Sequence, residues 1–413
     1  MTTAASKPRP LDGLKVVDMT TVLMGPFATQ LMGDMGADVI KVEAPGGDNT
    51  RHIGPARNPG MGSIFLNVNR SKRSVVLDLK QPAGREALMR LCLDADVVVY
   101  NIRPQAMTRL GLDYATLAAA NPRLIYAGLV GYDPRGPYAS RPAYDDLIQG
   151  AIGLPALAQR AGSDEPRYVP LTIADYFVGV SGTTAILGAL HHRDRTGEGQ
   201  ELVIPMFETM AQLVLAVHLG GRTFEPNQGP PGYERLLAPQ RRPYRTSDGY
   251  VCALIYTDRQ CANFFRAVGR ADLFEQDPRF ANITSRTRHI NELYSLVEQI
   301  LTERTTAAWI ELLSAADIPV MPMHDLDELI DDPHLAAVGL IAKTEHPTEG
   351  MLNSVNVPAL WSRTQPAPGC AAPRLGQHSA EVLRDIGYSD SDIEALIRSG
   401  ATFDPAFNSR QEA

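Results

Sequence analysis

The feature that most constrains the fold is the alternation of short β-type runs with helical patterns over the first 130 residues. The β-type runs are rich in Val, Ile and Leu and mostly lack polar alternation, which is typical of strands buried on both faces of a parallel sheet. Helical patterns lie between them, at Pro26–Met35, Ala83–Ala95 and Tyr114–Ala120. Strand–helix alternation of this kind predicts a doubly wound α/β sheet. The expected strands are Leu14–Met19, Ala37–Val42, Ser74–Leu79, Asp96–Ile102 and Arg123–Val130.

The pattern changes in the middle of the chain, and 413 residues are too many for one ordinary core, so we expect two domains. A long apolar helix is expected from about Asp175 to His192, followed by a buried strand at Glu201–Pro205 and a helix at Phe207–Leu219. Residues 220–243 are rich in Gly, Pro and Arg and predict a linker or binding loop. Beyond it we expect a strand at Tyr250–Tyr256, helices at Asn291–Ile300 and Thr306–Ala315, an apolar connector at Ile318–Met323 and a short helix at Ser379–Ile386.

The charge and the cysteines limit the function classes. A formal net charge of −8 argues against nucleic acid as the main partner, because phosphate backbones attract basic proteins. The same net charge is compatible with a local basic pocket for a small phosphorylated ligand. The four cysteines show no CxxC spacing, which favours a reducing compartment and no metal site. The polar N-terminus resembles no signal peptide and no run of about 18 apolar residues is present, so we expect a cytoplasmic protein without membrane association.

Asp175 is the candidate nucleophile, because it starts a helix that is otherwise almost wholly apolar. Such a helix must be buried, and a buried carboxylate without partners is costly. The amides and the dipole at a helix N-terminus stabilise an anion, which predicts an ionised carboxylate in a partly dry site. Carboxylates in such sites serve as nucleophiles. The alternative is an ordinary first-turn aspartate that only supports the helix, which is common.

Polar residues near the strand ends suggest a ligand site, since ligands of open α/β sheets bind at the carboxyl ends of the strands. The loop at residues 20–30 follows a strand but lacks GxGxxG and P-loop spacing, so a nicotinamide cofactor is not supported. Near the strand ends lie the segment 101–104, which contains Arg103, and the further cations Arg109 and Lys80. Such cationic side chains could bind the phosphates of a nucleotide-like ligand. The NRSKR run at residues 69–73 suits them as well, although a solvated turn is the commoner explanation of such a run.

From about Leu11 to Ser399 the chain resembles the class III CoA-transferases, which include formyl-CoA:oxalate and carnitine CoA-transferases and, more distantly, α-methylacyl-CoA racemase. The resemblance rests on several long segments in the same order: LDGLKVVDMTTVLMGPFATQLMGDMGADVIKVEAP, NVNRSKRSVVLDLK, NIRPQAMTRLGLDY, IADYFVGVSGTTAILGALHHRDRTGEGQ and PRLGQHSAEVLRDIGYSD. It implies a Rossmann-like large domain built from both chain ends, a smaller α+β domain and an interlocked homodimer. The implied boundaries are 1–220 and 334–413 for the large domain and 221–333 for the linker and small domain.

The resemblance also implies the activity, which is transfer of coenzyme A from an acyl-CoA donor, such as succinyl-CoA, to a carboxylic acid. The family's nucleophilic aspartate falls on Asp175, which forms an anhydride and then an aspartyl-CoA thioester. Coenzyme A is then a substrate, with no permanently bound cofactor. The family's CoA-contacting positions fall on Val22, Leu23, Leu77, Lys80, Asn101, Ile102, Arg103, Arg109, Arg141 and Tyr144.

Departures from the family pattern bear on the substrate. Ala44 stands where formyl-CoA transferases carry an arginine, and their glycine-rich run is absent, which puts oxalate and formate in doubt. Arg241 and Arg242 suit the second carboxylate of a larger diacid, with a solvated basic turn as the alternative. An acyl-CoA racemase is the runner-up, but Tyr144 stands where that branch has its histidine, and tyrosine is a poor proton shuttle at neutral pH. A non-catalytic CoA-binding protein is the third hypothesis.

Overall fold

A computed structural model describes residues 8–407, which form two compact units. Unit 1 comprises residues up to 148, 171–210 and those from 333 onward, and unit 2 comprises residues 149–170 and 211–332. The chain therefore leaves and re-enters unit 1 twice. Residues 149–170 belong to unit 2, although the expected boundaries assigned all of 1–220 to the large domain.

A six-stranded parallel sheet, in the order β3-β2-β1-β4-β5-β6, forms the centre of unit 1. The chain starts in the middle, builds outward to β3 and then returns to β4 on the other side of β1. Ligands of doubly wound sheets bind beside such a reversal of strand order, here between β1 and β4. The fold is thus a mixed α/β fold with a parallel central sheet, as the sequence predicted. The strands are β1 (Lys15–Met19), β2 (Asp38–Glu43), β3 (Lys72–Val76), β4 (Val97–Tyr100), β5 (Ile125–Val130) and β6 (Gln200–Pro205).

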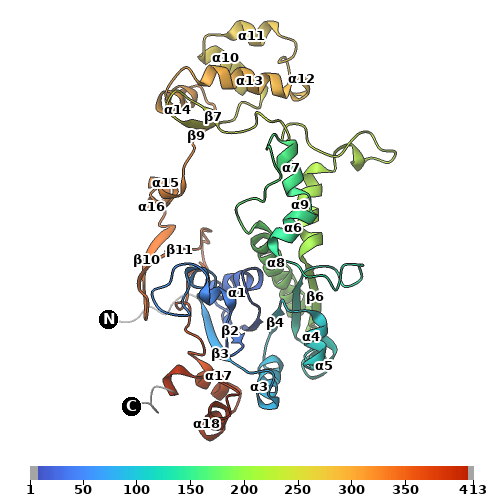
Figure 1. The fold of residues 1–413 in the computed structure, drawn as a ribbon, viewed down its shortest axis with the longest axis vertical. Coiled ribbons are helices and arrows are strands. Elements are labelled where there is room, and N and C mark those ends of the chain that lie inside the picture. Colours follow the sequence, from blue (N-terminus) through green and yellow to red (C-terminus); the bar gives the residue numbers. More distant parts are fainter. Residues whose placement is uncertain (1–7, 408–413) are drawn as a thin grey trace. The chain divides into compact units, whose positions relative to one another are not determined.

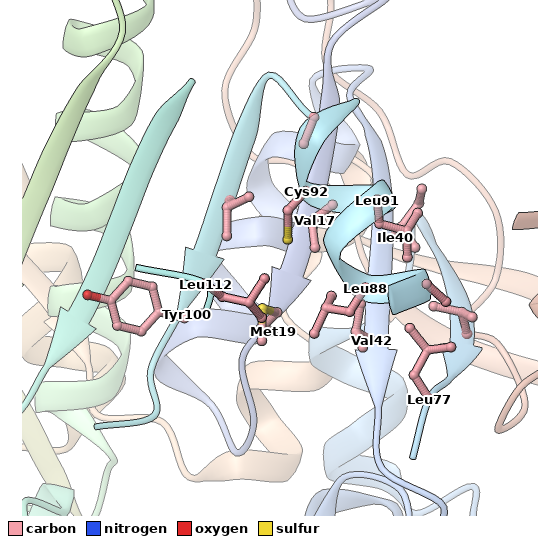
Figure 2. Packing of buried hydrophobic residues seen from close by; sticks show 14 of the residues in the cluster. Val17, Met19, Ile40, Val42, Leu77, Leu88, Leu91, Cys92, Tyr100 and Leu112 are labelled. Carbon is pink, nitrogen blue, oxygen red and sulfur yellow. The ribbon is translucent and has the colours of Figure 1, made fainter. Parts of the chain in front are cut away.

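Helices follow most strands of this sheet (Figure 1). On one face, Leu88, Leu91 and Cys92 of α3 point toward Val17 and Ile40 of the strands in a fully apolar core (Figure 2). The central strands β4 and β5 are buried on both faces, as their apolar runs predicted. The edge strand β6 was expected to be buried and is not, since its residues are half-buried or exposed apart from Ile204. The helical elements up to residue 148 are α1 (Met24–Asp34), η1 (Asn49–His52), α2 (Ser63–Val68), α3 (Pro82–Leu93), α4 (Pro104–Arg109), α5 (Tyr114–Ala120) and the start of α6 (Asp145–Ala151).

The long helix α8 (Ile173–Thr196) packs on α1, β5 and β6 of unit 1. Two glycines permit this close approach: a Cβ at Gly179 would lie 2.7 Å from the Met24 carbonyl oxygen, and one at Gly182 would lie 3.1 Å from Leu129. By length and composition α8 is also long and apolar enough to cross a membrane, which the sequence expectation had not allowed for. One side of α8 packs against α1 and the sheet, while Phe177 and Val180 on another side are exposed.

The NRSKR run is neither a solvated turn nor a phosphate site, so both expectations for it were wrong. Lys72 is fully buried and lies 3.0 Å from the carboxylate of Asp18, while Arg70 pairs with Asp34 at 2.8 Å. Arg73 pairs with three carboxylates, including Asp38 at 2.6 Å. Buried cations persist only when they are paired, so this run holds the first strands and helices of unit 1 together.

The C-terminal part of unit 1 contains elements that the sequence did not predict. The hairpin of β10 (Ile341–His346) and β11 (Gly350–Val355) alternates half-buried and exposed residues, and the helix α18 (Asp390–Arg398) lies beyond the last helix expected from the sequence. The expected short helix is α17 (Ser379–Asp385), which packs on β3. The C-terminal part also contains α16 (Pro333–Ala337). Unit 1 further includes the start of α9 (Met206–His218), which lies earlier in the chain.

Unit 2 is built on a three-stranded antiparallel sheet in the order β7-β8-β9. Helices α13 and α14 pack on it around Phe264, Phe265 and Trp309. The strand β9 lies inside the segment that was expected to be a connector. The elements are α7 (Leu154–Arg160), η2 (Gly220–Thr223), β7 (Tyr244–Arg245), β8 (Tyr250–Ala253), α10 (Asp258–Ala267), α11 (Ala271–Gln276), α12 (Ile283–Arg288), α13 (Ile290–Leu301), α14 (Thr306–Ala315), β9 (Val320–Pro322) and α15 (Leu326–Ile330).

The glycines of α8 give a test of this packing. Gly179→Ala should destabilise unit 1 by about 1–3 kcal/mol, because the new methyl group collides with backbone of α1. Gly188→Ala is the matched control on the same helix, since a Cβ there meets nothing within 4 Å. It should instead stabilise the protein by up to about 1 kcal/mol through helix propensity. Calorimetric unfolding of both variants measures the difference, and equal unfolding temperatures would contradict the close α1–α8 packing.

Candidate active site

A cavity of about 430 Å³ lies at the carboxyl ends of β1, β4 and β5 in unit 1. Its walls are the loop after β1, the loop after β4, residues 131–145 after β5 and the first turn of α8. This is the edge of the sheet beside the reversal of strand order, where a doubly wound fold places its ligand. Asp175 lines the cavity and carries a side chain that can react.

The loop after β1 is held in a strained conformation. Val22 has a φ of 71°, which is unfavourable for a β-branched residue and persists only when the surroundings fix it. Asn101 supplies one restraint, because its side chain accepts from the Thr21 amide at 3.1 Å and donates to the Thr21 carbonyl at 2.8 Å. Asp48 supplies the other by accepting from the Val22 amide at 3.3 Å. The loop therefore presents a rigid wall to the cavity.

A group of buried charges supports that wall from below. The Asp48 carboxylate lies 2.9 Å from the ammonium of Lys41, whose side chain is fully buried and also donates to the Thr20 carbonyl. The cationic partner keeps the pKa of Asp48 below its usual value, against the effect of burial. Because Asp48 remains charged, it can fix both the lysine and the strained loop.

The side chain of Asp145, the first residue of α6, caps the N-terminus of α8. One carboxylate oxygen of Asp145 accepts from the amides of Ala174 at 2.8 Å and of Asp175 at 3.1 Å. These are amides of the first helical turn, which need an acceptor from outside the helix. The sequence predicted that the amides at the helix start stabilise the Asp175 carboxylate. In the structure the amides of Ala174 and Asp175 donate to Asp145 instead.

The carboxyl of Asp175 is consequently poor at ionising. Burial raises its pKa from 3.8 to about 7, and the negative charge of Asp145 adds to the effect. The pKa of the neighbouring Tyr176 is also raised, mainly by burial and further by Asp175. The expected readily ionised carboxylate is therefore replaced by a carboxyl that is part protonated near pH 7. Once ionised it is weakly solvated and basic, which suits a nucleophile or a proton acceptor.

The segment after β5 forms the outer wall of the cavity. The guanidinium of Arg141 lies 4.0 Å from the centre of the Tyr138 ring, a cation–π contact. Tyr132 packs near both Tyr138 and Phe207, with ring centres 5.7 Å apart in each case. Arg141 thus reaches the cavity from an aromatic support and adds a positive charge to it.

The cavity brings together most of the residues named from the sequence. It is lined by the predicted residues Val22, Asn101, Ile102, Arg103, Arg141, Tyr144 and Asp175. It is not lined by Leu23, Leu77, Lys80 or Arg109. Leu77 is 1% exposed as a whole residue and its side chain belongs to the apolar core (Figure 2). Lys80 and Arg109 are exposed on the surface.

Sequence reasoning missed the role of Asp145. Asp145 lies 30 residues before Asp175, so its carboxylate forms no local capping pattern, because the usual capping residue directly precedes the helix. Thr172 stands in that position here and makes no side-chain capping bond. Thr172 and Asp175 even have the spacing of a local capping box, so nothing in the sequence signals that a distant acceptor is used.

Comparison with known proteins finds relatives along nearly the whole chain. The family profile described as CoA-transferase family III matches residues 11–379. An acyl-CoA transferase from Fusarium pseudograminearum is 34% identical over 406 residues, which cover 96% of this chain and 88% of the relative. A succinate–glutarate CoA-transferase from Agrobacterium fabrum is 32% identical over 401 residues, covering 94% of this chain and 98% of the relative.

A solved structure shares the fold. The crystal structure of a CAIB/BAIF family protein from Brucella suis is similar with a TM-score of 0.77 and 32% sequence identity. The match covers 92% of this chain and 100% of that chain. Both units of the present chain therefore fall within the compared region.

The raised pKa of Asp175 predicts a pH-dependent cost to stability. The folded pKa of about 7 exceeds the unfolded value near 4, so the wild type loses stability as pH rises through that window. Asp175→Asn removes the charge and should gain about 4 kcal/mol over wild type at pH 8 relative to pH 4. Urea unfolding at both pH values measures the gain.

Two variants sharpen this test. Asp145→Asn should shrink the pH-dependent loss, because a neutral amide oxygen still accepts from the helix amides but no longer repels Asp175. Asp146→Asn is the control, since Asp146 is an exposed neighbour that lines no part of the cavity. If wild type and Asp175→Asn responded equally to pH, Asp175 would have an ordinary pKa.

Proposed function

We propose, from the premise that this chain belongs to CoA-transferase family III and is a CoA-transferase, that Asp175 is its nucleophile. The observation that carries the proposal is the position of the Asp175 carboxyl. It lines the same cavity as the strained loop after β1 and the loop after β4, with a pKa raised to about 7. A weakly solvated carboxylate that faces a ligand-sized cavity has the basicity and the access that acyl transfer requires.

The reaction follows in two exchanges. The Asp175 carboxylate attacks the carbonyl carbon of the donor thioester, and the C–S bond breaks to give a mixed anhydride and CoA thiolate. The thiolate then attacks the aspartyl carbonyl, which releases the donor acid and leaves an aspartyl-CoA thioester. The acceptor carboxylate attacks this thioester and the same steps run in reverse. Atoms and charge balance at each step, and Asp175 is regenerated.

Such a pathway places demands on the cavity. The anhydride is readily hydrolysed, so water must be kept from it, and backbone N–H groups must stabilise each tetrahedral oxyanion. The amides of Ala174 and Asp175 already donate to Asp145, so other donors must serve that purpose. Asp145 is a positioning residue in this scheme, because it fixes the helix turn that carries Asp175 and raises the basicity of its carboxylate.

CoA binds, in this proposal, along the cavity wall. Arg103 and Arg141 offer cations for its phosphates, and Val22, Asn101, Ile102 and Tyr144 line its path. Leu23, Leu77, Lys80 and Arg109 remain proposed contacts outside the cavity lining. Succinyl-CoA is the proposed donor, and the name of the Agrobacterium relative, a succinate–glutarate CoA-transferase, supports small dicarboxylic acids as substrates.

The proposed assembly is an interlocked homodimer that works in the cytoplasm, without nucleic acid, membrane or permanent cofactor. Exposed apolar side chains support a protein partner: Phe177 and Val180 on α8 are 36% and 47% exposed, and Leu215 and Val217 on α9 are 48% and 45% exposed. Helix faces of this kind are usually covered by another chain. A second copy of this chain is the proposed cover.

The direct test is transfer from succinyl-CoA to glutarate, followed by chromatography of the CoA thioesters. Asp175→Asn should lower the rate at least about a thousand-fold, since an amide forms no anhydride under these conditions. CoA binding should persist in this variant. Asp146→Asn, which removes an exposed carboxylate, is the matched control and should transfer at the wild-type rate.

The outcomes separate the three hypotheses. Full activity of Asp175→Asn would exclude the proposed nucleophile. Solvent deuterium entering the α-carbon of a 2-methylacyl-CoA without an acceptor acid would instead indicate the racemase. CoA binding without exchange between acids in the wild type would indicate a non-catalytic binding protein.

A further inference from the structure

Unit 2 contains a second cavity, of about 370 Å³, which we call the unit 2 cavity. It lies along the β7-β8-β9 sheet and shares no lining residue with the cavity of Asp175. Three arginines line it and no acidic residue does. Its full lining is Arg235, Arg241, Arg242, Pro243, Tyr244, Cys252, Ala253, Leu254, Ile255, Tyr294, Pro319, Val320 and Met321.

The apolar floor of this cavity follows from the period of two along a strand. Val251 of β8 is fully buried in the core of unit 2, so the next residue, Cys252, points to the opposite face. Met321 of β9 is the direct cross-strand partner of Cys252 and is 61% exposed, and Leu254 is 41% exposed. Exposed apolar side chains on one sheet face, beside cations, are typical of a site for a ligand with an apolar body.

The three arginines differ in how their charge is used. Arg242 lies 2.8 Å from Glu298, so its charge is already compensated. Arg235 is half-buried, lies over the Tyr256 ring at 4.6 Å and donates through Nε to the Tyr294 hydroxyl. Neither Arg235 nor Arg241 forms an ion pair with any carboxylate within the described residues 8–407. Arg235 therefore holds a half-buried charge that faces only an aromatic ring and a neutral hydroxyl, while Arg241 is exposed and its charge is available to an anion from outside.

We propose that the unit 2 cavity binds an organic acid with an apolar chain. The carboxylate pairs with the guanidinium groups of Arg235 and Arg241, and the chain lies against Leu254 and Met321. Guanidinium groups match the geometry of a carboxylate, and a cavity of this volume is larger than a two- to four-carbon acid needs. The inference goes beyond the proposed function, because it requires no reaction at Asp175. It also modifies the expectation for the Arg241–Arg242 pair, since Arg242 is engaged by Glu298.

The test is a titration of the full-length protein with octanoate, followed by NMR of methionine methyl groups labelled with ¹³C. The Met321 signal, assigned by its loss in Met321→Leu, should shift and saturate with octanoate. Octanamide, which has the same chain without the charge, should produce little shift. Arg241→Gln should weaken octanoate binding about tenfold, as the loss of one charge-assisted contact predicts.

Two further variants complete the design. Met321→Glu places a negative charge in the cavity at an exposed position and should also weaken octanoate binding without disturbing the core. Because this variant lacks the Met321 signal, its octanoate affinity is measured beside that of the wild type by isothermal titration calorimetry. Arg270→Gln is the charge-matched control in the same unit, because Arg270 pairs with Glu303 at 3.3 Å and lies outside the cavity lining.

The possible results decide between the alternatives. An unmoved Met321 signal, equal shifts with octanoate and octanamide, or equal affinities in Arg241→Gln and Arg270→Gln would each overturn the proposal. Asp175→Asn should bind octanoate at Met321 as the wild type does. If Asp175 proved not to be the nucleophile, the octanoate binding in the unit 2 cavity would be unaffected. Equally, a failure of octanoate to bind there would leave the assignment of Asp175 untouched.

Discussion

The carboxylate of Asp145 accepts hydrogen bonds from the amides of Ala174 and Asp175 in the first turn of α8, and the geometry of the candidate active site depends on those bonds. They tie the segment after β5 to the start of the long helix α8, so the outer wall of the cavity and Asp175 share one anchor. They also hold the negative charge of Asp145 near the Asp175 carboxyl. Burial, and then this neighbouring charge, raise the pKa of Asp175 to about 7.

A second constraint comes from the charges beneath the sheet edge. Lys41 and Lys72 are fully buried, and each lies within 3.0 Å of an aspartate carboxylate, Asp48 and Asp18 respectively. Burying such pairs gains little stability on its own, but removing one partner leaves a costly isolated charge. The pairs therefore act as fixed points. The Lys41–Asp48 pair holds Val22 in a conformation that the residue would not adopt by itself, and so helps to define the inner wall of the cavity.

The sequence predicted the parts of the molecule that short-range patterns encode. The continuous apolar runs of the central strands and the apolar length of α8 follow from burial alone, and the loops after β1 and β4 meet because parallel strands end at one edge. Arg70 and Lys72 each pair with a carboxylate far away in the sequence, and the first turn of α8 is capped by the distant Asp145. No local sequence pattern reveals such contacts. The β10–β11 hairpin was missed because its strands are only partly buried and carry a weak apolar signal.

The central claim is that the Asp175 carboxylate is covalently acylated during transfer. The most direct measurement is mass spectrometry of peptides from enzyme incubated with succinyl-CoA and then trapped with hydroxylamine, which converts an aspartyl anhydride or thioester to a hydroxamate. The account predicts a hydroxamate at Asp175 that requires the acyl-CoA and is absent when CoA alone is supplied. Transfer at the normal rate with hydroxamate at another residue, or with none at Asp175, would contradict it.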